Sequence, residues 1–505
     1  MSLAVCVGWL CQTKLGLGVR GQWLITPHQW WPIGAWGLPL VVLFLFGGMA
    51  ALSAYDCFVR AKSPKESRQS AGLSVGALAL FALLWPWFLL GPGGTSNLVS
   101  ATFSDVSNQY FAAAWRMDGA REFTGSYSQK QQYPESVMLA HVATHPPGAV
   151  LFYYSARRVY EKLPFLKSTF EGFARWQTNE DIASLALTAN ASRRTAARVA
   201  GAESASTDLP LDAVGGAIWS AFLLSLAAAL CVPAVFLLAG MGENDIRLQR
   251  CRGLLAAALF AIAPALGLFT FTIDVLIAAG VLWALVLMAL GLRENGNSQK
   301  YFWLAASGFL VALSSFISFG ALVVWAVIGI VLMWRKQHFP ARLGAVILGF
   351  IAGWILLKVL FPMHLAAIFT QAMAAHRYAT LQSRSWSLWV WINIIIFAIF
   401  TGLPLWWMSL CSALGAMRQK YFSIAMQIGM AALAAMILVS LSGNARGEVE
   451  RLWLFLIAPL AVLAAQWISA VPTRKGVYAI IALLGAACLQ TLLMAAALGP
   501  LVRPF

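Results

Sequence analysis

The chain has 505 residues, of which 60% are hydrophobic and 11% are charged, with a formal net charge of +16. A soluble domain carries about a quarter charged residues, so this composition excludes a soluble protein and indicates an integral membrane protein. The positive charge lies in short loops between apolar segments, as in the cytoplasmic loops of membrane proteins. We therefore expect membrane lipid, and no nucleic acid, as a partner.

Residues 1–71 form the first expected unit, with an interfacial segment, an extra span and a basic cytoplasmic loop. Residues 1–36 are rich in Trp and weakly amphipathic, which favours a segment lying in the membrane interface. They lack a basic region followed by an apolar core and a cleavage site, so no cleaved signal is predicted.

Apolar runs of about 20 residues, the length that crosses roughly 30 Å of hydrocarbon, recur along the chain. They show no alternation of period two, which predicts an all-α polytopic fold of about twelve transmembrane helices and not a barrel. The expected spans are residues 37–56, 72–91, 213–240, 253–268, 272–292, 302–317, 319–334, 342–360, 387–412, 421–442, 452–470 and 477–498.

Loop charges set the expected orientation of these spans. The loops on one side carry sixteen basic and four acidic residues, whereas the long loop 92–212 on the other side carries eleven of each. The basic side is therefore predicted to be cytoplasmic, and 92–212 becomes a large first extracytoplasmic loop. Polar residues far apart in the sequence then share the extracytoplasmic face, which suits chemistry on a charged, lipid-borne substrate: Asp105, His145, Asp274, His376, Arg377, Arg384, Arg446, Glu448, Glu450 and Arg451.

Three parts of the 92–212 loop have recognisable patterns. Residues 148–160 begin apolar but are too short to span, so we interpret them as a re-entrant or interfacial helix. Residues 107–117 have aromatic and apolar positions at helical spacing, which predicts a helix lying in the interface. Residues 184–206 are rich in Ala and Ser and are interpreted as a mobile amphipathic arm.

Two residues of this loop are candidates for chemistry. Asp105 follows the second span beside aromatic residues, where a carboxylate could act as a general base with a raised pKa. The alternative is a solvated loop aspartate or a helix N-cap. His145 precedes Pro-Pro-Gly at a helix entrance, where backbone N–H groups favour anions, although a loop-corner histidine is the simpler interpretation.

Further candidates lie near the outer ends of later spans. Asp274 is the acidic residue placed well inside an apolar run, which makes it a functional hypothesis, with a hydrogen-bonded structural role as the alternative. Residues 361–386 supply His376, Arg377 and Arg384 with no acidic residue to neutralise them. Guanidinium groups bind phosphate bidentately, but these side chains could equally extend to lipid headgroups.

The segment 444–451, Asn-Ala-Arg-Gly-Glu-Val-Glu-Arg, places four charges at the mouth of the eleventh span. Glu448 and Arg451 are three residues apart and could pair on a helix. The block is therefore either a ligand site or a structural knot of salt bridges. The seven cysteines have no metal-ligand spacing, so neither a metal site nor a disulfide framework is expected.

Together these elements resemble polytopic members of the glycosyltransferase-C superfamily, which use polyprenyl-phosphate-linked sugars. The matching elements are Asp105 with Tyr-Phe-Ala after it, the HPPG element at 145–148, the Thr-Ile-Asp step ending at Asp274, and RGEVERLW at 446–453. The last block looks like the GE-x-x-R element of bacterial integral membrane proteins with this architecture. The resemblance assigns a catalytic membrane core to 72–412 and C-terminal membrane helices to 413–505.

The resemblance implies a site on the outer face of a bacterial inner (plasma) membrane. It implies inverting transfer of a sugar from polyprenyl phosphate to a cell-envelope glycan, lipid or protein. Asp105 would be the base, with His145 and Asp274 as further catalytic residues. No cofactor and no metal are expected, because the first loop lacks the paired acidic motif of metal-dependent members. Substrate and phosphate would be bound by His376, Arg377, Arg384, Arg446, Glu448 and Arg451.

Other functions remain open at this point. A lipid-linked glycan flippase or transporter would need polar residues along a path through the membrane, and the chain has no inverted repeat of the kind many transporters show. An envelope glycan ligase or polymerase would also place Arg and His on outer loops, without needing Asp105 and Asp274 together. A non-enzymatic assembly factor would tolerate the loss of both carboxylates.

Overall fold

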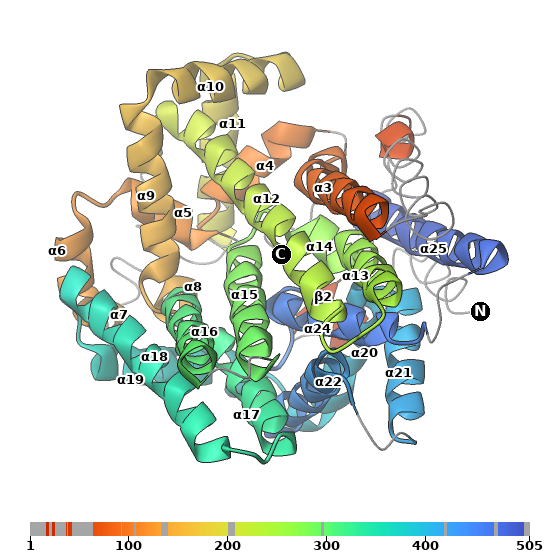
Figure 1. Ribbon diagram of the computed structural model, residues 1–505. Coiled ribbons are helices and arrows are strands. Elements are labelled where there is room, and N and C mark those ends of the chain that lie inside the picture. The colour runs from red at the N-terminus through yellow and green to blue at the C-terminus, as the bar shows by residue number, and fades with distance from the viewer. Residues whose placement is uncertain are drawn as a thin grey trace.

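The computed structural model describes residues 17–19, 23–25, 37, 39–42, 64–91, 93–105, 108–132, 140–199, 208–293, 297–418, 422–468 and 473–498. The interfacial segment expected at 1–36 and the span expected at 37–56 lie almost entirely outside these residues. Within the described part, one antiparallel pair of short strands, β1 (Leu17–Val19) and β2 (Trp23–Ile25), interrupts an otherwise helical fold. The expected all-α class therefore holds apart from this pair (Figure 1).

Seven helices of the described chain are long and apolar enough to cross a membrane. They correspond to seven of the expected spans, so the chain is a polytopic membrane protein. These helices are α3 (Pro64–Phe88), α12 (Asp212–Ala239), α15 (Asp274–Arg293), α16 (Asn297–Ile317), α18 (Phe339–Leu360), α22 (Ile424–Ser442) and α25 (Arg474–Leu498).

Four other expected spans are broken or shortened. The span expected at 387–412 is two helices, α20 (Trp386–Thr401) and α21 (Leu403–Ala416), because Gly402 has a φ of 97° and Pro404 follows it. The others are α13 (Ile246–Ala261) with α14 (Pro264–Phe269), η4 (Phe319–Val323) with α17 (Val324–Trp334), and α23 (Val449–Leu452) with α24 (Leu454–Ala465).

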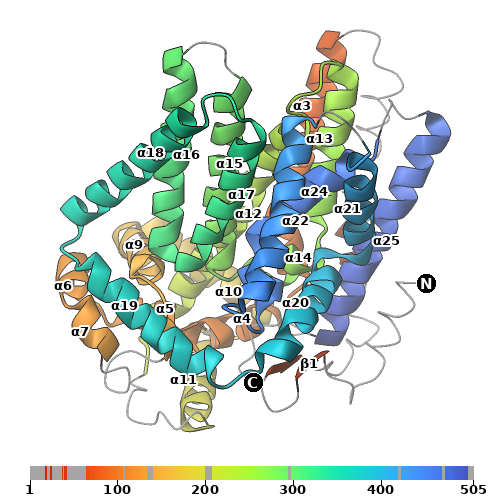
Figure 2. The ribbon, with the colours of Figure 1, turned by 90° about the horizontal axis from the view of Figure 1, so that it is seen from below.

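A helical corner precedes α20. The segment expected as a loop at 361–386 contains α19 (Leu365–His376) and a π-helical turn, η5 (Arg377–Leu381). Residues 365–381 meet α20 at an angle of 90°. This corner lies at the same end of the bundle as the 92–212 loop (Figure 2).

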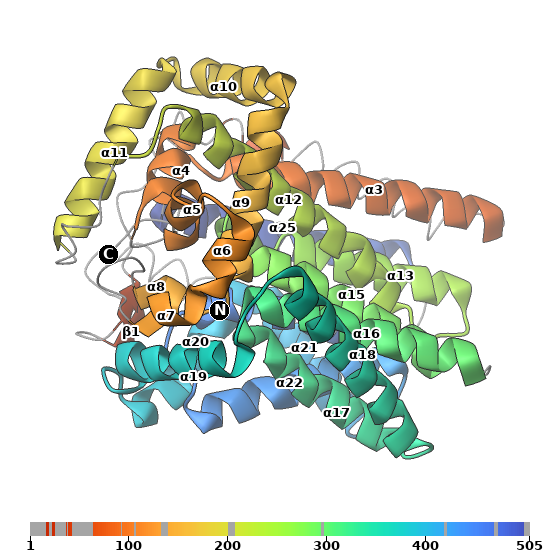
Figure 3. The ribbon, with the colours of Figure 1, turned by 90° about the vertical axis from the view of Figure 1, so that its left-hand side faces the viewer.

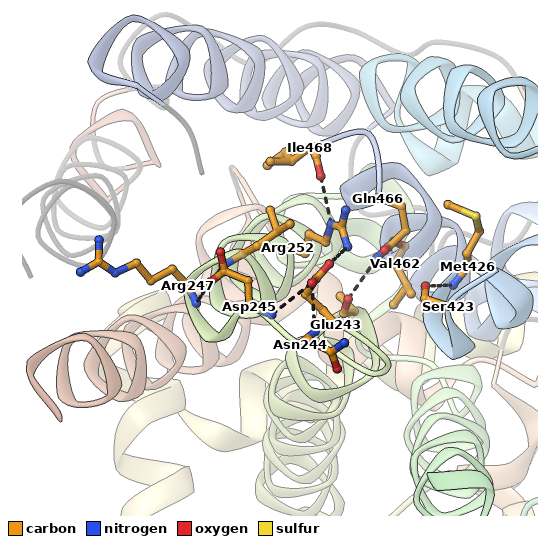
Figure 4. Close-up of polar contacts among 12 residues, drawn as sticks. Glu243, Asn244, Asp245, Arg247, Arg252, Ser423, Met426, Val462, Gln466 and Ile468 are labelled. Carbon is orange, nitrogen blue, oxygen red and sulfur yellow. Dashed lines mark hydrogen bonds and ion pairs between the residues drawn. The ribbon is translucent and has the colours of Figure 1, made fainter. Parts of the chain in front are cut away.

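The opposite end holds the basic loops, and their contacts agree with the topology derived from charge. Arg252 donates from Nε to the carbonyl oxygen of Ile468 at 3.0 Å, and its Nη1 lies 2.5 Å from the Glu243 carboxylate (Figure 4). Gln466 donates to the carbonyl oxygen of Ala239 at 3.0 Å. These segments border two of the loops predicted to share the cytoplasmic side, and they lie together in the structure.

The 92–212 loop is a layer of helices that covers one end of the bundle (Figure 3). Residues 148–162 form a helix that packs on α5 and α12 and is not among the spans, in agreement with the interpretation of this segment as non-spanning. The layer comprises α4 (Gly94–Phe103), α5 (Gln109–Trp115), α6 (Ala120–Gly125), α7 (Tyr127–Gln132), α8 (Ala140–Ala143), α9 (Gly148–Lys162), α10 (Pro164–Thr178) and α11 (Ile182–Val199).

Two membrane helices, α16 and α18, pack with their backbones in contact. A Cβ atom added at Gly349 would lie 1.8 Å from the carbonyl oxygen of Ala305, and one added at Gly308 would lie 1.9 Å from that of Val346. Small residues of this kind let helices approach closely in a membrane, where van der Waals packing drives their association.

Candidate functional site

Asp274 is the first residue of α15, and its carboxylate is buried. The Thr272 hydroxyl donates to its Oδ2 at 3.0 Å, and Nη1 of Arg451 lies 3.7 Å from the same oxygen. A buried carboxylate needs a positive partner or hydrogen bonds to remain charged, and Asp274 has both. The Thr-Ile-Asp step and the RGEVER block, distant in sequence, therefore meet.

Glu448 extends this contact into a row of alternating charges. Its Oε2 lies 2.5 Å from Arg451, and its Oε1 lies 3.1 Å from Arg384, which follows the α19 corner. Glu448 reaches this position from a left-handed backbone conformation, with a φ of 61°, directly after Gly447. Two carboxylates and two guanidinium groups thus lie in the order Asp274, Arg451, Glu448, Arg384.

Arg446 has a structural position within the same block. It donates to the carbonyl oxygens of Leu381, Arg384 and Gly443 at distances of 2.7, 2.5 and 2.9 Å. Arg384 donates in return to the carbonyl oxygen of Arg446. These bonds connect the α19 corner to the 443–448 loop.

Two further side chains hold the 443–448 loop in place. Nε2 of His376 lies 2.8 Å from the carbonyl oxygen of Asn444 and therefore donates the hydrogen bond. Asn393, buried on α20, donates to the carbonyl oxygen of Ala445 and accepts from the backbone N–H of Gly447. Arg377, by contrast, is exposed at the corner.

Glu450 is the one carboxylate of the block that points into the protein interior. It is 2% exposed, and its Oε2 has no hydrogen-bond partner among the described residues. Burial raises the pKa of Glu450 to about 8, and the charge on Glu448 adds to the effect, whereas Arg451 and Arg384 oppose it. Glu450 is therefore protonated at neutral pH, next to a row of charged neighbours.

Asp105 lies between α4 and α5 and forms a separate pair. Its Oδ2 lies 2.6 Å from Nη2 of Arg193 and 3.9 Å from Nη2 of Arg116. Burial raises the pKa of Asp105, and Arg193 opposes this rise. Asp105 is thus not a solvated loop residue, because its side chain is only 3% exposed, and the N-cap of α5 is Asn108.

Arg193 brings a correction to the interpretation of 184–206 as a mobile arm. Its side chain is 1% exposed, and it lies on α11, which packs against α4. Nearby, Asn190 exchanges two hydrogen bonds with the backbone of Leu209. The described part of the segment is therefore fixed to the layer. The signal was present in the sequence, because the buried positions follow helical spacing: Ile182, Leu185, Ala186, Ala189, Asn190 and Arg193.

An aromatic group connects the layer with Asp274. Burial raises the pKa of Tyr110, on α5, while the charge on nearby Arg451 opposes this rise and that on Asp274 adds to it. The ring of Tyr110 meets that of His145 edge to face, with centroids 5.7 Å apart. Nδ1 of His145 lies 3.1 Å from the hydroxyl of Ser318, at the start of η4. His145 is therefore held at the junction between the layer and the bundle.

The sequence-derived candidates thus form two groups at one end of the molecule. Asp274, Glu448, Arg451 and Arg384 form the charge row, with His145 close by through Tyr110. Asp105 is paired with Arg193, a residue that sequence reasoning missed. Among the described residues, no three His, Cys, Asp or Glu side chains come together as metal ligands. Comparison of the chain with protein-family models, with curated proteins and with solved structures finds no match.

Proposed function

We propose that the chain is a membrane glycosyltransferase of about twelve spans with a glycosyltransferase-C-like architecture. It would transfer a sugar from a polyprenyl-phosphate donor to an extracytoplasmic cell-envelope glycan, lipid or protein. The observation that carries the proposal is the meeting of Asp274, Arg451 and Glu448 beneath a helical layer. Carboxylates and guanidinium groups at one membrane boundary are suited to a substrate that contains both a sugar and a phosphate.

The division of roles follows from the surroundings of each carboxylate. Asp105 is assigned as the base that activates the acceptor hydroxyl, because its raised pKa improves its ability to accept a proton. Asp274 is assigned to orient Arg451. The leaving phosphate is already stable as an anion, so a positive charge that stabilises it suffices and no strong acid is required. Arg451 and exposed Arg377 are the candidates for that charge.

A flippase for a lipid-linked glycan is the main alternative. Transport through the membrane needs polar groups at mid-depth. Within the described chain, the fully buried charged residues of the spanning helices lie in their first turns, as Asp274, Lys300 and Arg342 do. This distribution favours chemistry at a boundary over passage across the bilayer.

The test is sugar transfer from a panel of radiolabelled polyprenyl-phosphate sugars, with the purified protein in nanodiscs and a membrane extract as acceptor. Asp105→Asn and Asp274→Asn are compared with Asp118→Asn, an exposed carboxylate of the same layer. We expect transfer to fall at least 100-fold in the first two variants and to persist in the third. Transfer retained by Asp105→Asn would remove its assignment as the base, and lipid movement without transfer would favour the flippase.

A further inference from the structure

The connection between α17 and α18, at the basic end of the molecule, brings two arginines together. Arg335 directly follows α17, and Arg342 lies in the first turn of α18. Arg335 donates from Nε to the side-chain oxygen of Gln427, on α22, at 3.0 Å. Arg342 donates from Nη1 to the backbone oxygen of Arg335 at 3.3 Å. The Arg342 guanidinium group therefore lies against the backbone of Arg335, and its charge acts on the Arg335 side chain.

Neither arginine forms an ion pair with a carboxylate among the described residues, and both donate to neutral oxygen atoms, the side-chain oxygen of Gln427 and the backbone oxygen of Arg335. Arg252, at the same end of the molecule, shows the usual arrangement, with its guanidinium group against the Glu243 carboxylate (Figure 4). Two like charges that share a partly buried position repel each other, and a bound anion would relieve this repulsion.

Burial increases the energetic cost of leaving the charges of Arg335 and Arg342 without a negative partner. Arg342 is 9% exposed, and its Nε is buried without an acceptor among the described residues. Arg335 is half-buried, and its pKa is lowered by burial and by the charge on Arg342. A guanidinium group has five N–H donors, and each arginine uses one of them in these contacts. Four N–H donors of each group are thus left over by these contacts.

The surroundings indicate that the ligand is a lipid. Met333 and Trp334, at the end of α17, are 55% and 43% exposed, directly before Arg335. The Trp334 ring lies 6.2 Å from that of Phe422. Exposed Trp residues of membrane proteins are enriched at the level of the lipid headgroups, with apolar neighbours in the acyl region. The arginine pair therefore lies where a headgroup phosphate would be.

We propose that Arg335 and Arg342 bind the phosphate of an anionic phospholipid on the basic face of the membrane. The two guanidinium groups would donate to the phosphate oxygens, which they match in geometry, and Trp334 would contact the glycerol and upper acyl chain. Basic pockets between transmembrane helices on the cytoplasmic side are known to take such headgroups. This site is separate from the proposed transferase site at the other end of the molecule, so either proposal can fail alone.

The experiment compares the wild type with the double variant Arg335→Gln/Arg342→Gln. A charge-matched control, Arg418→Gln/Arg474→Gln, removes two exposed arginines at the same end. Native mass spectrometry after release from nanodiscs that contain phosphatidylglycerol and phosphatidylcholine measures the retained lipid. We expect the wild type and the control to retain phosphatidylglycerol and the Arg335/Arg342 variant to lose at least three quarters of it. Equal retention by all three proteins would overturn the proposal.

A second measurement covers the case of a poorly folded double variant. The melting temperature of each protein is compared between nanodiscs of pure phosphatidylcholine and nanodiscs with phosphatidylglycerol, and between phosphatidylcholine nanodiscs with and without inorganic phosphate. Arg335→Gln alone should at least halve the rise in melting temperature that phosphatidylglycerol causes, whatever the absolute melting temperature of the variant. If inorganic phosphate produces the full increase, the site binds a free anion and the lipid assignment is wrong.

Discussion

Arg451 lies between two carboxylates that are far apart in the sequence, with Nη1 3.7 Å from Asp274 and Nη2 2.5 Å from Glu448. The first carboxylate belongs to the start of a membrane helix and the second to a loop after another one. A single guanidinium group thus joins α15 to the RGEVER block.

Arg451→Gln is expected to lower the free energy of unfolding by about 3–5 kcal/mol, because it leaves buried Asp274 without its positive partner and removes one of the two arginines paired with Glu448. Thermal unfolding in nanodiscs measures the change. Arg377→Gln, which removes an exposed arginine at the same end of the molecule, should change the stability by less than about 0.5 kcal/mol. Similar melting temperatures for the two variants would show that the contact to Asp274 contributes little.

The neighbours Arg193 and Arg194 offer a matched comparison. Arg193 is buried against Asp105, whereas Arg194 pairs with Asp208 at the surface. We expect Arg193→Gln to cost about 3 kcal/mol and Arg194→Gln less than about 1 kcal/mol. The cost of Arg193→Gln should be smaller at pH 5 than at pH 8, because protonation of Asp105 removes its unpaired charge.

Limited proteolysis supplies the structural readout for the same two variants. Cleavage within residues 182–199 should be faster in Arg193→Gln than in the wild type and unchanged in Arg194→Gln. If α11 is cleaved equally fast in all three proteins, Arg193 does not fasten this helix to the layer.

Glu450 predicts a pH dependence of stability. Its pKa is about 8 in the folded protein against an ordinary value of 4.5, so between these pH values the folded state holds a proton that the unfolded state has released. Stability from this group is therefore present at low pH and is lost as the pH rises toward 8. Unfolding at pH 5, 6.5 and 8 should show a steeper decline in the wild type than in Glu450→Gln. Equal declines of stability with pH in the two proteins would show that Glu450 does not have a raised pKa in the folded state.

Close packing between α16 and α18 gives a prediction inside the membrane. Gly349→Ala places a methyl group against the backbone of Ala305 and should destabilise the protein by about 1–3 kcal/mol. Gly344→Ala, on the same helix but with open space around the new methyl group, should be neutral or slightly stabilising. Melting temperatures of the two variants in nanodiscs measure the difference, and a destabilised Gly344→Ala with an unaffected Gly349→Ala would refute the packing.

Hydrophobicity was enough to predict the seven membrane helices. Hydrophobicity is a property of each segment by itself, so it can be read from the sequence without knowing how the segments pack. The break at Gly402 was missed because the residues on both sides are apolar, although the Gly-Leu-Pro sequence contained the signal. Whether Asp105 and Arg193 pair depends on how α4 and α11 pack, which no local pattern determines.

The candidate site was predictable in location but not in its internal connections. Charge alternation placed Asp274, Glu448 and Arg451 at one face, and the structure brings them into contact. Arg446 was expected to bind substrate phosphate, yet its donors meet three backbone carbonyl oxygens. The difference arises because carbonyl groups of the α19 corner face the 443–448 loop. Their position depends on the π-helical turn η5, for which the sequence has no recognisable pattern.

The exchange of hydrogen bonds between Arg384 and Arg446 has a mechanical consequence. Each guanidinium group donates to the backbone of the other residue, so the corner after α19 and the loop before α23 behave as one rigid piece. Arg384 also holds Glu448, which holds Arg451. A displacement of α19, or of the η5 turn after it with the exposed Tyr378, would therefore also shift the charge row.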